Sequence, residues 1–108
     1  IKDLKVLLRN AGFSQDEIPV MLCIMKWESS FFERALNYNN NGSIDFGLFQ
    51  INNRYWGKRN RSGCSYVGSE LLNYKNNLRC ARKIYQKKGY NAWNAYKKHK
   101  VECLNYKV

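Results

Sequence analysis

The stretch NNNGSIDFGLFQIN, residues 39–52, is the most informative about the fold of this chain. It contains residues typical of a tight turn, followed by apolar side chains at every second position. Asn41-Gly42 is the favoured pair for a two-residue type I′ turn and predicts a β-hairpin. Apolar residues alternate with polar or small ones from Ile44 to Leu48. We therefore expect a strand in which Asp45 points away from the aliphatic side chains.

Helical patterns precede this hairpin. Residues 2–11 predict a short helix that stops at Gly12. SQDE, residues 14–17, has the spacing of a capping box. Because Pro19 lacks a backbone amide, we expect the second helix to begin properly at Pro19, after a single turn, and to run to about Ser29.

The second half of the chain is also mainly helical. Residues 53–69 are expected to form an irregular loop. A helix is predicted from near Glu70 to Gly89, and a last helix over about 91–98. Helices on both sides of a small antiparallel sheet predict one α+β domain over residues 1–108.

Glu28 lies on the apolar stripe of the second helix, seven residues after Met21 and three after Met25. It also falls in the last turn, where the helix dipole disfavours a negative charge. Both effects raise the pKa of the Glu28 carboxyl, as a general acid requires. The alternative is a helix that ends one turn earlier and leaves Glu28 exposed.

Asp45 has a different setting, since it lies among amide side chains that can stabilise an ionised carboxylate. These are Asn39, Asn40, Asn41, Gln50 and Asn52. Ordinary turn chemistry is the alternative explanation. Together, Glu28 in an apolar setting and Asp45 in a polar one form the pair that acid-assisted glycoside hydrolysis uses.

Charge and cysteine content restrict the class of protein. The formal net charge is +11, and nine basic residues but no acid lie between Leu71 and Val101. Such a stretch suits nucleic acid, anionic lipid or bacterial wall, or is simply a solvated helix surface. No sequence-reading nucleic-acid motif is present. The longest apolar run has eight residues, too short for a transmembrane segment, and we expect any targeting segment to have been removed.

The four cysteines, at wide spacings, contain no close pair typical of zinc sites, and the single histidine His99 adds none. They are Cys23, Cys64, Cys80 and Cys103. Two disulfides in a secreted protein are expected, with three possible pairings.

KWESSFFERALNYNNNGSIDFGLFQINNRYWG, residues 26–57, resembles the active-site segment of the c-type lysozymes without a gap. NLRCARKIY and YNAW, within residues 77–93, resemble the family's central helix and the tryptophan segment after it. The resemblance implies a lysozyme-like fold, with a helical lobe, a small β-hairpin lobe and a cleft between them.

The resemblance also implies roles for individual residues. Glu28 matches the general acid, and Asp45 the nucleophile or electrostatic stabiliser. The implied substrate-binding residues are Asn37, Asn39, Gln50, Asn52, Tyr55, Trp56, Ala92 and Trp93. Among them, Tyr55 and Trp56 match two tryptophans that stack on sugars, and Trp93 matches one beside the glutamate.

The cysteine pairs Cys23–Cys103 and Cys64–Cys80 match two of the family's usual four bridges. Lys87 stands near an acidic residue that many members use in the outer cleft. The stretch GSELLNYKNN, residues 68–77, lacks the aspartate cluster of calcium-binding members, so no metal or cofactor is expected.

The resulting hypothesis is a secreted, monomeric lysozyme. It would hydrolyse, with retention, the β-1,4 bond between N-acetylmuramic acid and N-acetylglucosamine in peptidoglycan, and bind chitin oligomers. Its charge would favour anionic surfaces. The alternatives are a non-catalytic carbohydrate-binding protein of the same fold and a cationic membrane-active protein.

Overall fold

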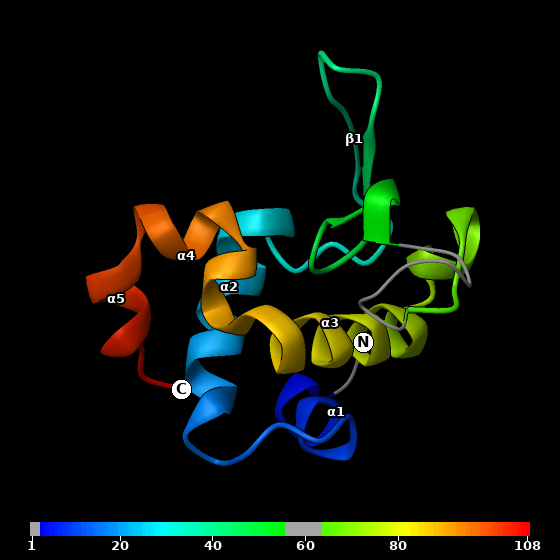
Figure 1. Cartoon of the computed structure of the whole chain (residues 1–108). Helices are drawn as coiled ribbons and strands as arrows, with labels where there is room; N and C mark the ends of the chain where they lie inside the picture. Colours follow the sequence, from blue (N-terminus) through cyan, green and yellow to red (C-terminus); the bar gives the residue numbers. More distant parts are fainter. Residues whose placement is uncertain (1–2, 56–63) are drawn as a thin grey trace.

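The computed structural model of this chain describes residues 3–55 and 64–108 (Figure 1). In chain order the elements are α1 (Leu4–Asn10), α2 (Glu17–Ser29), β1 (Leu36–Tyr38), β2 (Ile44–Phe46), β3 (Ile51–Asn52), the 3-10 helices η1 (Asn53–Tyr55) and η2 (Gly68–Leu72), α3 (Tyr74–Lys88), the 3-10 helix η3 (Gly89–Ala92), α4 (Asn94–Lys98) and α5 (Lys100–Leu104). The β1–β2 hairpin projects away from the helices (Figure 1). The α+β class is confirmed.

The start of α2 is fixed by the capping box that the sequence predicts. The Ser14 amide donates to Glu17 Oε1 at 2.8 Å, and the Glu17 amide donates to Ser14 Oγ at 3.3 Å. The helix therefore begins at Glu17, and the expected start at Pro19 is wrong. Pro19 is tolerated because it lies in the first turn, where backbone amides have no partner within the helix.

The hairpin turn differs from the prediction. The Asn39 amide donates to Ser43 O at 2.9 Å, and the Gly42 amide donates to Asn39 O at 3.0 Å. Gly42 is left-handed, with φ 86°, but Asn41 is not. A type I′ turn needs positive φ at both central residues, so that prediction is wrong; the connection is a three-residue loop ending in a left-handed glycine.

The sheet has three antiparallel strands in the order β1-β2-β3, one more than the predicted hairpin. Asp45, in the middle of β2, lies opposite Asn37 of β1 and Asn52 of β3. Residues directly opposite each other share a face of the sheet, so these three polar side chains form one row. The register thus brings two amides beside a carboxylate.

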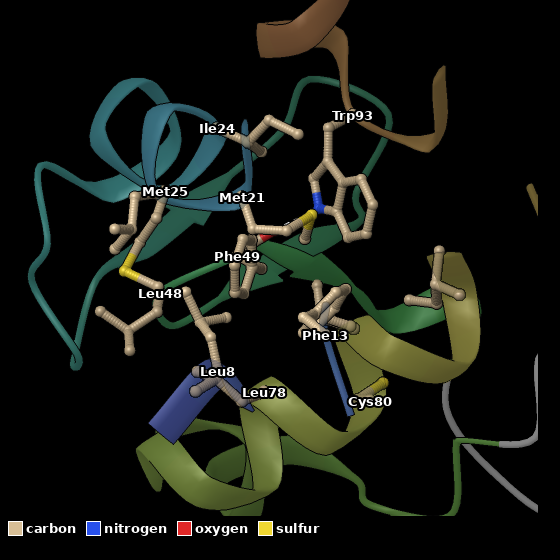
Figure 2. Packing of buried hydrophobic residues seen from close by; sticks show 14 of the residues in the cluster. Leu8, Phe13, Met21, Ile24, Met25, Leu48, Phe49, Leu78, Cys80 and Trp93 are labelled. Atoms are coloured by element: carbon tan, nitrogen blue, oxygen red, sulfur yellow. Dashed lines mark hydrogen bonds between the residues drawn. The ribbon is translucent and has the colours of Figure 1, made fainter. Parts of the chain in front are cut away.

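The hydrophobic core joins α2 to the segment after β2 (Figure 2). Met21 and Met25 of α2 lie beside Leu48 and Phe49, and Leu8 of α1 packs below them (Figure 2). All five side chains are fully buried. This packing fixes the helix that carries Glu28 against the chain that carries Asp45.

A buried asparagine connects α3 to the sheet. Asn77 Nδ2 donates to Phe46 O and to Leu71 O, each at 2.8 Å, and its Oδ1 accepts from the Phe49 amide at 2.9 Å. Asn77 is 0% exposed, so its side chain satisfies three main-chain groups without water.

The helices after the loop begin later than expected. Glu70 lies in η2, and α3 starts only at Tyr74. The Asn73 side chain fixes this start, because its Oδ1 accepts hydrogen bonds from the Lys75 and Asn76 amides at 3.0 and 3.2 Å. The predicted stop at Gly89 is confirmed, with φ 69°. The predicted helix over 91–98 is divided between η3 and α4, and α5 was not expected.

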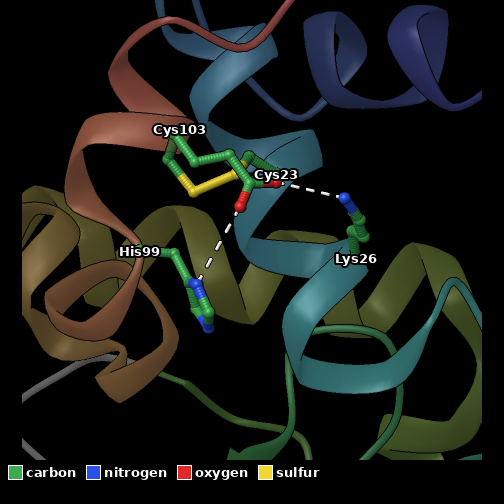
Figure 3. A network of polar contacts seen from close by, with 5 residues as sticks. Cys23, Lys26, His99 and Cys103 are labelled. Carbon is green, nitrogen blue, oxygen red and sulfur yellow. Dashed lines mark hydrogen bonds and ion pairs between the residues drawn. A yellow bond between two sulfur atoms is a disulfide. The ribbon is translucent and has the colours of Figure 1, made fainter.

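The disulfides join Cys23 to Cys103 and Cys64 to Cys80, the pairings that the resemblance implied. The first connects α2 to α5. Beside it, Glu102 accepts a hydrogen bond from Lys26 Nζ at 3.1 Å and lies 3.9 Å from His99 Nδ1 (Figure 3). A disulfide and the Lys26–Glu102 ion pair therefore connect α5 to α2.

Candidate active site

A cleft of about 460 Å³ contains both predicted carboxylates. It is lined by α2, the sheet and its turn, η1, α3 and the η3–α4 segment. The lining residues named by the sequence analysis are Glu28, Asn39, Asn40, Asn41, Asp45, Gln50, Asn52, Tyr55, Ala92 and Trp93. Amide side chains therefore form much of one wall, while the Trp93 side of the cleft is apolar.

Glu28 lies in the last turn of α2, which continues to Ser29, so the alternative of an earlier helix end is wrong. Its side chain is partly buried, and Oε2 accepts a hydrogen bond from the Ala95 amide at 3.4 Å. Burial, with a smaller contribution from the Asp45 charge, raises the pKa of Glu28 from 4.5 to about 7, against the opposing effects of the Ala95 amide and Lys98. Glu28 can therefore hold a proton near neutral pH.

Asp45 has both carboxylate oxygens engaged by amides. Asn52 Nδ2 donates to Oδ1 at 2.9 Å, and Asn39 Nδ2 donates to Oδ2 at 3.2 Å. The same two amides also donate to Ser43 Oγ, each at 3.0 Å. Two amide donors aimed at one carboxylate fix its position, an arrangement that turn formation alone does not require.

Gln50 and Asn37 form a second polar pair in this lobe. Gln50 Nε2 donates to Gly47 O at 2.9 Å and to Ala35 O at 3.2 Å, while its Oε1 accepts from Asn37 Nδ2. Gln50 lines the cleft, whereas Asn37 does not. The exposed Asn37 thus lies outside the cleft lining, and its hydrogen bond helps to orient the Gln50 side chain.

Trp93 and Ala92 lie where η3 passes into α4. Trp93 is 5% exposed, and its Nε1 donates to Phe49 O at 3.0 Å. Its ring centre is 5.7 Å from that of Phe49 (Figure 2). Trp93 therefore presents a small apolar surface to the cleft and anchors the α4 segment, which supplies the Ala95 amide, to the chain that follows β2.

Tyr55 lies on the cleft wall but is only 8% exposed. Its neighbour Trp56, the other predicted stacking residue, falls outside the described residues. Lys87, predicted near the outer cleft, lies in the last turn of α3 and is not among the lining residues.

The C-type lysozyme/alpha-lactalbumin family matches residues 2–107 of the sequence. The chain belongs to this family. It is 37% identical over 101 residues to "Lysozyme c-1" of Anopheles gambiae, covering 90% of this chain and 72% of that protein. It is 38% identical over 96 residues to "Lysozyme C, milk isozyme" of Equus caballus, covering 82% and 74%.

The lysozyme-like fold is likewise confirmed by a solved structure. The crystal structure of a lysozyme from Litopenaeus vannamei aligns with a TM-score of 0.71 and 35% identity, over 91% of this chain and 90% of that one. In the two described ranges, no helix is long and apolar enough to cross a membrane. Within the same ranges, no group of three or more His, Cys, Asp or Glu side chains could hold a metal ion.

Some cleft residues were not singled out from the lysozyme-like sequence. Ser43 connects the amides on both sides of Asp45, and Arg54 and Asn94 also line the cleft. The position of Ser43 directly after the turn was a usable signal. Arg54, beside a predicted sugar-stacking residue, was another.

Proposed function

We propose that this chain is a lysozyme that hydrolyses the β-1,4 bond between N-acetylmuramic acid and N-acetylglucosamine in peptidoglycan. The observation that carries the proposal is the pairing, in one cleft, of a partly buried glutamic acid with an amide-bound aspartate. The family match and the lysozyme relatives support a glycoside hydrolase.

In the first step, Glu28 donates its proton to the glycosidic oxygen as the bond to the leaving sugar breaks. A pKa of about 7 means that a large fraction of Glu28 is protonated at neutral pH. Lysozyme is the type case of this two-carboxylate chemistry, so the division of roles is carried over from the family.

Asp45 stabilises or attacks the positively charged anomeric carbon that develops. The amides of Asn39 and Asn52 fix the carboxylate, so that little reorganisation is needed as charge appears. In the second step Glu28, now ionised, removes a proton from the water that attacks the anomeric carbon and releases the sugar from Asp45. Two displacements at the same carbon give retention of configuration.

The remaining cleft residues are proposed to bind the glycan. The backbone of Ala92 would bind an N-acetyl group, Trp93 would pack beside the sugar next to Glu28, and Gln50 would contribute a polar edge. Chitin oligomers, built from the same N-acetylated sugar, fit the same groups. We also propose that the protein is a secreted monomer whose net charge of +11 favours an anionic wall and makes its activity sensitive to salt.

Clearing of bacterial wall suspensions by the wild type and by Glu28→Gln tests the proposal. The wild type is expected to clear the suspension and the variant to lose nearly all activity. Equal clearing rates would refute the roles assigned here. Saturable binding of chitin oligomers without products would indicate a carbohydrate-binding protein, and killing that survives Glu28→Gln would indicate action on membranes.

A further inference from the structure

Two cations meet at one side chain of the cleft wall. Arg54 Nη2, from η1, donates to the hydroxyl oxygen of Tyr55 at 3.1 Å. Lys88 Nζ, from the end of α3, donates to the same oxygen at 3.4 Å. The guanidinium carbon and the ammonium lie 4.9 and 5.0 Å from the centre of the Tyr55 ring. Two elements far apart in sequence therefore bring two positive charges to one hydroxyl.

The two like charges that contact the same oxygen repel each other. The ring face and the hydroxyl attract both cations, but neither carries a full negative charge. An anion placed between Arg54 and Lys88 would convert this repulsion into two attractions. The cluster thus suits a negatively charged ligand better than a neutral one.

The cluster also changes what Tyr55 can offer to a sugar. With 8% of its surface exposed and cations near its ring, Tyr55 has little free face for stacking. Arg54 and Lys88 are themselves exposed. Arg54 lines the same cleft as Glu28 and Asp45. A glycan in the cleft therefore meets charge at the place where the family resemblance predicts an aromatic platform.

We propose that Arg54 and Lys88 form a subsite for a carboxylate of the glycan substrate, so that the cleft selects peptidoglycan over neutral chitin. This inference rests on the proposed function. Each N-acetylmuramic acid carries a lactyl carboxyl group, which is free or is linked to a peptide that bears carboxylates. Chitin has no carboxyl group. The planar guanidinium of Arg54 matches a carboxylate with two parallel hydrogen bonds, and Lys88 adds a second charge.

The test compares three glycans of equal length: peptide-free strands with free lactyl carboxylates, strands that keep their peptides, and chitin oligomers. The variants are Arg54→Gln and Lys88→Gln. The matched control is Lys83→Gln, which removes an exposed charge of α3 that borders a different hollow, beside the Cys64–Cys80 bridge.

Arg54→Gln and Lys88→Gln are each expected to raise KM for a carboxylate-bearing glycan by up to about fivefold, the upper end of the range for an exposed ion pair, and to leave KM for chitin unchanged. The difference should shrink as ionic strength rises. The control should behave as the wild type with all three glycans. An effect confined to the peptide-bearing strands would place the carboxylate in the peptide, and an effect on peptide-free strands would place it on the lactyl group.

Equal changes in KM for chitin and for the charged glycans, or no change for either, would overturn the subsite. The same comparison by calorimetry in a Glu28→Gln background measures binding without cleavage. If the wild type cleaves none of the glycans, the proposed hydrolase fails. The calorimetric preference, or its absence, still decides the carboxylate subsite.

Discussion

Replacing Glu28 with glutamine is expected to stabilise the folded protein above neutral pH, at the same time as it removes activity. Burial is the largest cause that raises the pKa of this carboxyl from 4.5 to about 7. Glutamine has nearly the same shape, stays neutral at every pH, and retains an oxygen that can accept from the Ala95 amide. The substitution therefore removes mainly the charge.

The magnitude follows from linkage between protonation and folding. Below about pH 4, Glu28 is protonated in both the folded and the unfolded chain, so its ionisation costs nothing. Between about pH 4.5 and 7 the unfolded chain releases the proton that the folded protein still holds, and the free energy of unfolding falls as pH rises. Above pH 7 the full cost applies, about 3 kcal/mol for the difference between the two pKa values.

Urea unfolding of the wild type and of Glu28→Gln, at pH 4 and at pH 8, measures this cost. The two proteins should have similar stability at pH 4, and the variant should be more stable by up to about 3 kcal/mol at pH 8. Glu102→Gln is the control with the opposite sign. The hydrogen bond from Lys26 lowers the pKa of Glu102, so its ionised form favours the folded state and that contribution is lost on acidification. A stability difference for Glu28→Gln that is the same at both pH values would refute the raised pKa.

Four further predictions concern the cleft and its support. The value of kcat/KM should fall above about pH 7 as Glu28 loses its proton. Because the Asp45 charge raises the pKa of Glu28, Asp45→Asn should move the Glu28 titration, followed by NMR, to lower pH. An unmoved titration would contradict this interaction between the two carboxylates. Asn52→Ala should lower kcat about tenfold, because it removes a hydrogen-bond donor to Asp45, and should change thermal stability little. Full activity of the variant would show that this hydrogen bond does not position the carboxylate. Asn77→Leu should reduce the free energy of unfolding, measured in urea, by roughly 3–5 kcal/mol, because three buried main-chain groups lose their hydrogen-bond partner. A loss below about 1 kcal/mol would mean that these main-chain groups find other partners.

The main parts of the site could be predicted because they depend on local periodicity. Glu28 follows the apolar pattern of α2, and Asp45 falls on the polar side of an alternating strand, but these local patterns alone left a non-catalytic alternative open for each residue. Their pairing and the resemblance to the c-type lysozymes favoured the catalytic roles. The capping box that starts α2 is similarly local. These signals lie within two turns of a helix or one strand.

Other features depend on contacts that the local sequence does not record. Asn-Gly also suits a three-residue loop with a left-handed glycine, so the pair alone did not identify the turn type. The strand β3 has only two residues and exists through its pairing with β2. The break between η3 and α4 places Trp93 so that its indole Nε1 donates to Phe49 O. These two residues are 44 positions apart, so no local pattern predicts the contact.

The two members of the candidate catalytic pair are held by different kinds of interaction. The helix that carries Glu28 is tied to α5 by the Cys23–Cys103 bridge. The other bridge ends on α3, and neither reaches the sheet that carries Asp45. That sheet is held by the fully buried Asn77, which hydrogen-bonds the chain on both sides of Gly47, and by the core around Phe49. A chain with two of the family's usual four bridges can thus keep its cleft, because buried hydrogen bonds and packing, which do not need an oxidising environment, fix the lobe that the disulfides leave untied.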